Sequence, residues 1–311
     1  MSDVRSTASQ EDLEEVPQGP SEGKGKDATR GLWGDAWYEL RRSPTFWSAS
    51  VLVAIVTSMA VFPFLWTSVE PDACFLAEHG REAPSLDGRW FGYTFQGCDM
   101  WAQVVYGSSK SLAVAVLSAI GVSVIGVALG TAAGYYGGFV DSVIGRFTDV
   151  FFGLPFLLGA LVFLAIVPVR NVWSISGVLI VLGWTSLTRI MRGSVLSTKN
   201  KDFVDASRAL GASNRHIIFK HVLPNSIAPL FVLSTIYLGA FVSAEATLTY
   251  LGVGFQQPDA TWGLLIQEGQ PYALQGSPHL LIIPCAFVVV TVLAFILLGD
   301  VLRDALDPRN R

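Results

Sequence analysis

Residues 111–140 read SLAVAVLSAIGVSVIGVALGTAAGYYGGFV, and none of them carries a charge. A helix rises 1.5 Å per residue, so about 20 apolar residues cross the hydrocarbon core of a bilayer. This stretch is long enough to do so, and its lack of charge suits a lipid environment. We therefore predict a membrane-spanning helix here, and this helix determines the class of the fold.

Other parts of the chain share this character. The chain is 51% hydrophobic and only 15% charged, with a mean hydropathy of +0.47, whereas soluble domains carry about 25% charged residues. Five more stretches are apolar enough to span a membrane or nearly so, and they cover residues 46–66, 150–169, 171–188, 226–244 with a continuation past Glu245, and 280–299. The sequence predicts an all-α membrane protein with about six transmembrane helices.

The basic residues are distributed unevenly between the connections. With the N-terminus inside, the inner segments 1–45, 135–149, 189–225 and 300–311 contain 6, 1, 7 and 3 basic residues, or 17 of the 21. Loops rich in Lys and Arg stay in the cytoplasm. We therefore expect a multi-pass protein of the cell membrane with both termini cytoplasmic.

The longest inner connection contains a short amphipathic stretch. Residues 202–224 read DFVDASRALGASNRHIIFKHVLP. Asp202 is predicted to cap a helix that begins near Phe203, Gly211 to end it, and Leu223–Pro224 to break the second amphipathic stretch. An apolar stripe along this helix could dock on a partner or lie on the membrane surface, and the pattern leaves both open. The stripe consists of Phe203, Ala206 and Leu210.

The same connection resembles the cytoplasmic signature of ABC importer permeases, which runs Glu-Ala-Ala, three residues, Gly, nine residues, Ile, one residue, Leu-Pro. Asp205-Ala206-Ser207 stands for the first three, Gly211 and Leu223-Pro224 match in spacing, and His221 replaces the usual Ile. The similarity covers about residues 90–308 and is closest to the second permease subunit of the dipeptide/oligopeptide permease family. Its further motifs are Gly97-Cys98-Asp99, Gly134 to Gly138 with Asp141, Arg146, Asp149 and Pro155, Tyr250 to Gly254 with Trp262-Gly263, and Leu298 to Asp300 with Arg303 to Pro308.

This resemblance implies a permease subunit of an ATP-driven, binding-protein-dependent importer of di- or oligopeptides. It implies partners in a second permease subunit, two ATP-binding subunits and an extracytoplasmic peptide-binding protein, with membrane lipid around them and no nucleic acid. The helix at about 203–213 would couple to an ATPase subunit. The coupling residues would be Asp205, Ala206, Ser207, Leu210, Gly211, Leu223 and Pro224.

The motifs of this chain agree with the expectation that ATP binds to partner subunits. A P-loop requires Gly-x-x-x-x-Gly-Lys-Ser/Thr, whereas the two Gly-Lys pairs, Gly23-Lys24 and Gly25-Lys26, are followed by Gly25 and Asp27 and not by Ser or Thr. We expect no catalytic residues, no metal site and no cofactor on this chain, with ATP and Mg²⁺ on the partner ATPase subunits.

These expectations divide the chain into five parts. The first 30 residues are too polar to bury a core and should be disordered. The Trp-rich stretch after them could form an amphipathic helix along the inner surface. The parts are a cytoplasmic tail (1–30), an interfacial helix with the first span (31–66), an extracytoplasmic loop (67–104), a permease core with five spans (105–303) and a cytoplasmic tail (304–311).

Three further groups of residues have two interpretations each. Glu245 could line the translocation path, since ionisable groups in spans are costly, or it could be a structural acid. Gly126, Gly130 and Gly134 share one helix face and could form a sliding or a static interface. Cys74 and Cys98 share the outer loop and could form a disulfide or stay free.

Charges at the inner end of the third span give a fourth case. Arg146 and Asp149 are three residues apart and could pair on one helix face near Asp141. This pair could rearrange during transport or remain a static ion pair.

Three other functions stay open at this point. A related importer for nickel or another small solute would share the signature. A secondary carrier would work without an ATPase, but it often shows internal repeats, and none is evident here. An intramembrane protease requires paired acids or a Ser/His pair within the spans, whereas Glu245 stands alone.

Overall fold

The computed structural model describes residues 32–85 and 90–306. The predicted disordered tail, the Gly23-Lys24 pair and the terminal Asp307-Pro308 lie outside the described residues. In the described parts the chain is helical, and two isolated bridges, Cys74 to Cys98 and Tyr93 to Asp99, are its β contacts. The longer helices are α1 (Leu32–Leu40), α2 (Pro44–Val61), α4 (Met100–Tyr136), α5 (Gly138–Phe152), α6 (Phe156–Ile166), α7 (Val172–Lys199), α8 (Asp202–Ala209), α11 (Ala228–Tyr250), α12 (Trp262–Ala273) and α13 (His279–Leu306).

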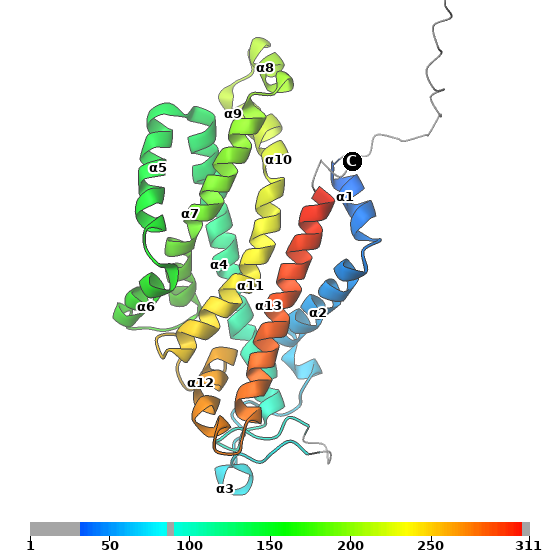
Figure 1. Ribbon diagram of the computed structural model, residues 1–311, viewed down its shortest axis with the longest axis vertical. Coiled ribbons are helices and arrows are strands. Elements are labelled where there is room, and N and C mark those ends of the chain that lie inside the picture. The colour runs from blue at the N-terminus through cyan, green and yellow to red at the C-terminus, as the bar shows by residue number, and fades with distance from the viewer. Residues whose placement is uncertain (1–31, 86–89, 307–311) are drawn as a thin grey trace, which may run out of the picture.

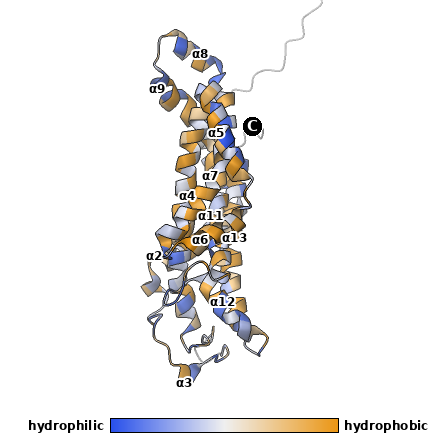
Figure 2. Cartoon of the chain, turned by 90° about the vertical axis from the view of Figure 1, so that its left-hand side faces the viewer, coloured by the Kyte–Doolittle hydropathy of each residue, from blue (hydrophilic) through white to orange (hydrophobic). Residues whose placement is uncertain are grey.

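Five helices in the described part are long and apolar enough to cross a membrane, namely α2, α4, α7, α11 and α13. A sixth crossing exists only if the bent pair α5 and α6 is counted as one span. Figure 2 shows apolar residues along the middle of the long helices and polar ones gathered toward the two ends. The predicted all-α membrane fold is confirmed.

The third predicted span, 150–169, is wrong as a single helix. The chain bends by 82° between α5 and α6, at Gly153-Leu154-Pro155. Proline lacks a backbone N–H and disfavours the helical conformation in the residue before it. The bend places α6 across the direction of α5 (Figure 1).

The second span is longer than its apolar stretch. Asp99 caps α4, since its side chain accepts a hydrogen bond from the Ala102 N–H at 2.8 Å. The helix ends before Gly137 and Gly138, whose φ angles of 67° and 53° favour glycine. Helix α4 has 37 residues, because it begins well before the uncharged stretch 111–140.

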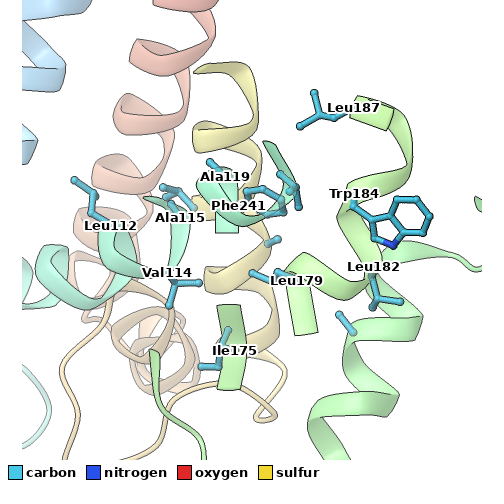
Figure 3. Close-up of a cluster of buried hydrophobic side chains, with 14 of the residues drawn as sticks. Leu112, Val114, Ala115, Ala119, Ile175, Leu179, Leu182, Trp184, Leu187 and Phe241 are labelled. Carbon is cyan, nitrogen blue, oxygen red and sulfur yellow. The ribbon is translucent and has the colours of Figure 1, made fainter. Parts of the chain in front are cut away.

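The centre of the fold is the packing of α4, α7 and α11. Buried side chains such as Val114, Leu179 and Phe241 meet between these helices (Figure 3). The glycines of α4 face α7: a Cβ on Gly126 would lie 2.8 Å from Leu187 Cβ, and one on Gly130 would lie 2.6 Å from Met191 Cβ. Small residues thus let the two backbones approach closely.

The connection between the predicted spans 226–244 and 280–299 contains a helix, α12, that the sequence analysis does not predict. Thr261 caps α12 by accepting a hydrogen bond from the Leu264 N–H. Trp262 is fully buried, and its indole N–H donates to the Val104 carbonyl at 3.0 Å. Trp262 therefore fixes the beginning of α12 against α4.

The two ends of the molecule differ in what they carry. Helices α8 and α9 (Asn214–Ile217) project at one end, together with α1 and the last described residues of α13 (Figure 1). Helices α3 (Leu76–His79) and α12 lie at the opposite end. The two ends of the described chain thus lie on the same side of the spans as α8.

Candidate coupling loop and translocation groove

The short helix predicted in the inner connection is α8. Its N-cap residue is Lys201, and Asp202 lies inside the first turn, so the predicted cap at Asp202 is displaced by one residue. Asp202 and Asp205 in this turn still suit the positive end of the helix dipole. The helix ends at Ala209 with Leu210 as C-cap, and Gly211 follows with φ +79°, as predicted from the sequence.

The apolar stripe of α8 is open to solvent. Leu210 is 88% exposed and Phe203 is 41% exposed, and Ala206 between them is also exposed. Val204, which the sequence reading did not single out, is fully buried and joins the main core together with Ile217. Val204 thus holds the helix to the body while its stripe remains free.

The acidic residue of the signature makes a local ion pair. Asp205 accepts from the Arg208 guanidinium at 2.7 Å, and both side chains are more than half exposed. Exposed pairs of this kind contribute about 0–1 kcal/mol. The pair therefore orders the helix surface, and Asp205 stays accessible to a partner.

The second amphipathic stretch differs from its prediction. It continues as α9, a π-helical turn (Ile218–Val222) and α10 (Leu223–Ser226), and Pro224 lies in the first turn of α10 instead of breaking the helix. A proline interrupts the ordinary i to i−4 bonding, and a π turn provides a different spacing. The chain therefore stays helical nearly to the start of α11.

Polar contacts fasten this connection to the neighbouring spans. The Tyr135 hydroxyl donates to Asn214 Oδ1 at 2.9 Å, and the Lys199 ammonium donates to the Gly134 carbonyl at 2.7 Å. The Ser194 hydroxyl donates to the Ser226 carbonyl at 2.8 Å. These bonds join the ends of α4 and α7 to the segments that flank α8.

The predicted pair of Arg146 with Asp149 is wrong. The Arg192 guanidinium donates to both carboxylate oxygens of Asp141, at 2.6 Å for Oδ2, and Arg189 donates to Asp149 at 2.7 Å. Both arginines come from α7, so tertiary contact replaces the local i, i+3 pairing. These pairs hold α5 against α7.

An apolar groove runs along the other face of α4. Its volume is about 890 Å³. Ser123 of α4 and Ser234 of α11 both line it, and their hydroxyl groups are hydrogen-bonded at 2.7 Å. Apolar residues of α4 and of the 218–238 segment line the groove, together with Arg215 and Tyr136. The exposed ones among them include Val116, Ile120, Val124, Phe219 and Phe231.

Glu245 does not line this groove. Its side chain is fully buried in α11, and its Oε1 accepts from the Thr249 hydroxyl at 2.8 Å. Thr249 in turn accepts from the Phe255 N–H at 3.2 Å. Through Thr249, Glu245 is connected to the turn that follows α11.

Substitution of Glu245 separates its two interpretations. Glu245→Gln keeps the shape and a hydrogen-bonding oxygen, so we expect uptake rate and half-saturating substrate concentration to stay close to wild type. Glu245→Ala leaves Thr249 without its partner, which costs about 1–3 kcal/mol, and the melting temperature should fall. A Gln variant with normal melting temperature but weakened substrate affinity would instead place Glu245 in the path.

A disulfide joins Cys74 to Cys98 and closes the outer loop. The loop lies against α4, since the Gln103 side-chain amide donates to the Pro71 carbonyl at 2.6 Å. Cys98 is buried. The loop is thereby tied to the N-terminal end of α4 and to Asp99, its cap.

Peptide mass mapping tests this bond. We expect the peptides that contain Cys74 and Cys98 to migrate as one cross-linked species without reductant and to separate, each with one added hydrogen, after reduction. Cys285, which is free in the structure, provides the internal control and should not change. Identical masses with and without reductant would show that the bond is absent.

Comparison with known proteins supports the resemblance seen in the sequence. The family described as the inner membrane component of binding-protein-dependent transport systems matches residues 126–311, and the N-terminal transmembrane domain of oligopeptide transport permease C matches residues 31–81. The dipeptide transport system permease protein DppC of Bacillus subtilis is 38% identical over 279 residues, which cover 89% of this chain and 86% of that protein.

Two other relatives and one solved structure agree with these matches. The oligopeptide transport permease OppC of B. subtilis is 32% identical over 90% of each chain, and the glutathione transport permease GsiD of Escherichia coli is 34% identical over 91% of this chain and 92% of its own. The inward-facing MetNI methionine ABC transporter shares the fold, with a TM-score of 0.53, 22% identity, and coverage of 66% of this chain and 97% of the other. The chain therefore belongs to the family of inner membrane components of binding-protein-dependent transport systems.

Proposed function

We propose that this chain is the second permease subunit of an ATP-driven importer of di- or oligopeptides, with both termini in the cytoplasm. Relatives named for dipeptide, oligopeptide and glutathione transport support the substrate class. The excess of basic residues in the inner segments supports the orientation. The ends of the described chain lie at the same end as α8, which fits this topology (Figure 1).

One observation carries the proposal: α8 presents an exposed apolar stripe at the end of the molecule while its opposite side is buried. Leu210 is 88% exposed, whereas Val204 is fully buried. Contiguous exposed apolar surface marks sites of protein interaction, and Phe203, Ala206 and Leu210 form such a surface. The occupant that we propose is a cleft on the ATP-binding subunit.

The contacts around α8 suggest how motion would reach the groove. When ATP closes the ATPase pair, α8 moves with its cleft. Val204 and Ile217 tie it to the core, and helical structure from Asn214 to Ser226 leads to α11. The contact of Tyr135 with Asn214 leads to α4. Because α4 and α11 form the walls of the groove, a movement of α8 would be transmitted to both walls.

We propose that this groove forms one half of the translocation path and that the second permease subunit forms the other half. Its walls carry exposed apolar side chains such as Ile120 and Val124, which a second permease subunit would cover. Ser123 and Ser234 in its lining add polar atoms for a peptide backbone. A path shared between two chains would account for a groove that remains open in one chain alone.

ATP hydrolysis belongs to the partner subunits under this proposal. The sequence contains no P-loop motif, so the chain is a transport subunit and not an enzyme, and ATP with Mg²⁺ would bind to the two ATP-binding subunits. An extracytoplasmic binding protein would deliver the peptide to the end that carries α3 and α12. Neither nucleotide nor metal is assigned to this chain.

The proposed topology can be measured with a membrane-impermeant maleimide. A cysteine at Leu210, on α8, should react only in inside-out vesicles, and a cysteine at Leu274, which is 99% exposed beside α12, should react only in right-side-out vesicles. The two leucines are matched in chemistry and exposure. Reaction of Leu210→Cys from the outside would contradict the orientation.

The substrate class is tested by uptake into proteoliposomes that contain the complete assembly. Labelled dipeptides and oligopeptides should accumulate with ATP, and glutathione, itself a tripeptide, serves as a third probe. Nickel ions test the alternative importer. Uptake of nickel without any peptide uptake would overturn the peptide assignment but leave the permease role intact.

A further inference from the structure

The connection between α1 and α2 lies where a transmembrane helix leaves the hydrocarbon. Helix α2 begins at Pro44, and the Ser43 side chain caps it by accepting from the Phe46 N–H at 3.3 Å. None of its 18 residues is charged, and only 17% of them are buried within the chain. The residues just before it, Arg41 and Arg42, therefore lie at the level of the lipid headgroups.

Both arginines are held over aromatic rings. The Arg41 guanidinium lies 4.8 Å from the Trp37 ring centroid, and the Arg42 guanidinium lies 4.1 Å from that of Tyr38. Arg42 also donates a hydrogen bond to the Tyr38 hydroxyl. The Trp47 indole N–H donates to the Arg41 carbonyl at 3.1 Å, which ties the connection to the first turn of α2. Stacking of this kind positions a guanidinium without neutralising it.

Neither arginine forms an ion pair with a carboxylate whose side chain the structure describes. The first turn of α2 contains no acidic residue. Both side chains are exposed. Arg41 and Arg42 are adjacent in sequence, and guanidinium groups bind phosphate oxygens through charge-assisted, often bidentate, hydrogen bonds.

The connection between α1 and α2, which carries Arg41 and Arg42, is packed against the rest of the protein. Leu40 is buried in a cluster with Val232, Ala305 and Leu306, and Phe46 packs against this cluster. Phe46 also contacts Trp37 edge to face, with ring centroids 6.2 Å apart. The position of the arginines is therefore set by contacts with α11 and α13 and not by a free tail.

We infer that Arg41 and Arg42, with Trp37 and Tyr38, form a binding site for the phosphodiester headgroup of an anionic phospholipid. The guanidinium groups bind the phosphate oxygens, and Trp37 and Trp47, which are 47% and 53% exposed, lie at the interface beside the acyl chain region. The site is independent of the transported substrate. It adds a lipid contact at the point where α1 meets the ends of α11 and α13.

Native mass spectrometry of the purified assembly tests this site. The assembly is titrated with phosphatidylglycerol and with phosphatidylcholine of the same acyl chains. We expect wild type to prefer the anionic lipid by about 30-fold, since each basic residue near an anionic surface contributes about a factor of 5. Arg41→Gln/Arg42→Gln should remove the preference. Arg303→Gln, an exposed arginine at the same end of the molecule, is the matched control and should keep it.

Two further arms make the result decisive. The double variant Arg41→Lys/Arg42→Lys keeps both charges but loses the planar guanidinium groups, so its preference for the anionic lipid should fall between those of wild type and the double glutamine variant. It replaces the double glutamine variant in the test if that variant does not fold. Excess inorganic phosphate should leave phosphatidylglycerol bound. Equal loss in Arg303→Gln, an unchanged preference in both double variants, or displacement by inorganic phosphate would overturn the proposal.

Discussion

Replacing Leu210 with aspartate is expected to lower ATP-driven uptake by at least about 30-fold, the effect of losing a central apolar anchor from an interface. Leu210 is 88% exposed, so the change removes no contact within this chain and the protein should insert and fold as wild type. A charge on the stripe would be buried without a partner when the ATPase cleft closes around α8. Uptake and ATPase stimulation are measured in proteoliposomes with the complete assembly.

The matched control is Leu274→Asp. Leu274 is 99% exposed beside α12, at the opposite end of the molecule, and its substitution should leave coupling intact. Deletion of residues 203–213 should also abolish uptake, but it removes the buried Val204 and so tests folding as well. If Leu210→Asp retained wild-type uptake while folded, α8 would not be the coupling element.

Gly130→Ala is expected to lower the melting temperature strongly, with a loss of about 1–3 kcal/mol typical of overpacking. An added Cβ would lie 2.6 Å from Met191 Cβ and 2.7 Å from the Thr188 carbonyl oxygen. The carbonyl belongs to the backbone of α7 and cannot rotate away. The two central helices must therefore move apart, and contacts along their whole length weaken.

Gly177→Ala is the control for this substitution. Gly177 lies in α7, and nothing lies within 4 Å of an added Cβ there. Alanine is a better helix former than glycine by up to about 1 kcal/mol, so the variant should be unchanged or more stable. Thermal unfolding in detergent compares the two. Equal melting temperatures would mean that the close approach of α4 to α7 contributes little to stability.

Hydropathy predicted the spans because lipid leaves few alternatives: backbone polar groups in hydrocarbon must be satisfied within helices. It did not predict the 82° bend between α5 and α6, since 150–169 is apolar on both sides of Gly153 and Pro155. Hydropathy reports the environment of residues and not the direction of the chain. Helix α12 was missed for a related reason, because Gly263 and Pro271 lie within it and both are poor helix formers.

The local structure of residues 202–211 was easier to predict than the contacts of this segment with the rest of the chain. The exposed stripe of Phe203, Ala206 and Leu210 follows from local spacing, as does the turn at Gly211. The anchoring of Val204 depends on which side of the helix meets the body, and periodicity cannot decide that. The pairing of Asp141 with Arg192, residues 51 apart in sequence, likewise depends on how α5 packs on α7.

Site-specific cross-linking tests the central claim most directly. A cysteine at Leu210 is treated with a short bifunctional reagent in the native assembly, alongside the same treatment of a cysteine at Leu274. We predict that the first joins this chain to a nucleotide-hydrolysing subunit, with a yield that changes when ATP binds, and that the second does not. Absence of any such product from Leu210→Cys, or its equal formation from Leu274→Cys, would contradict the proposal that α8 transmits ATP-driven motion.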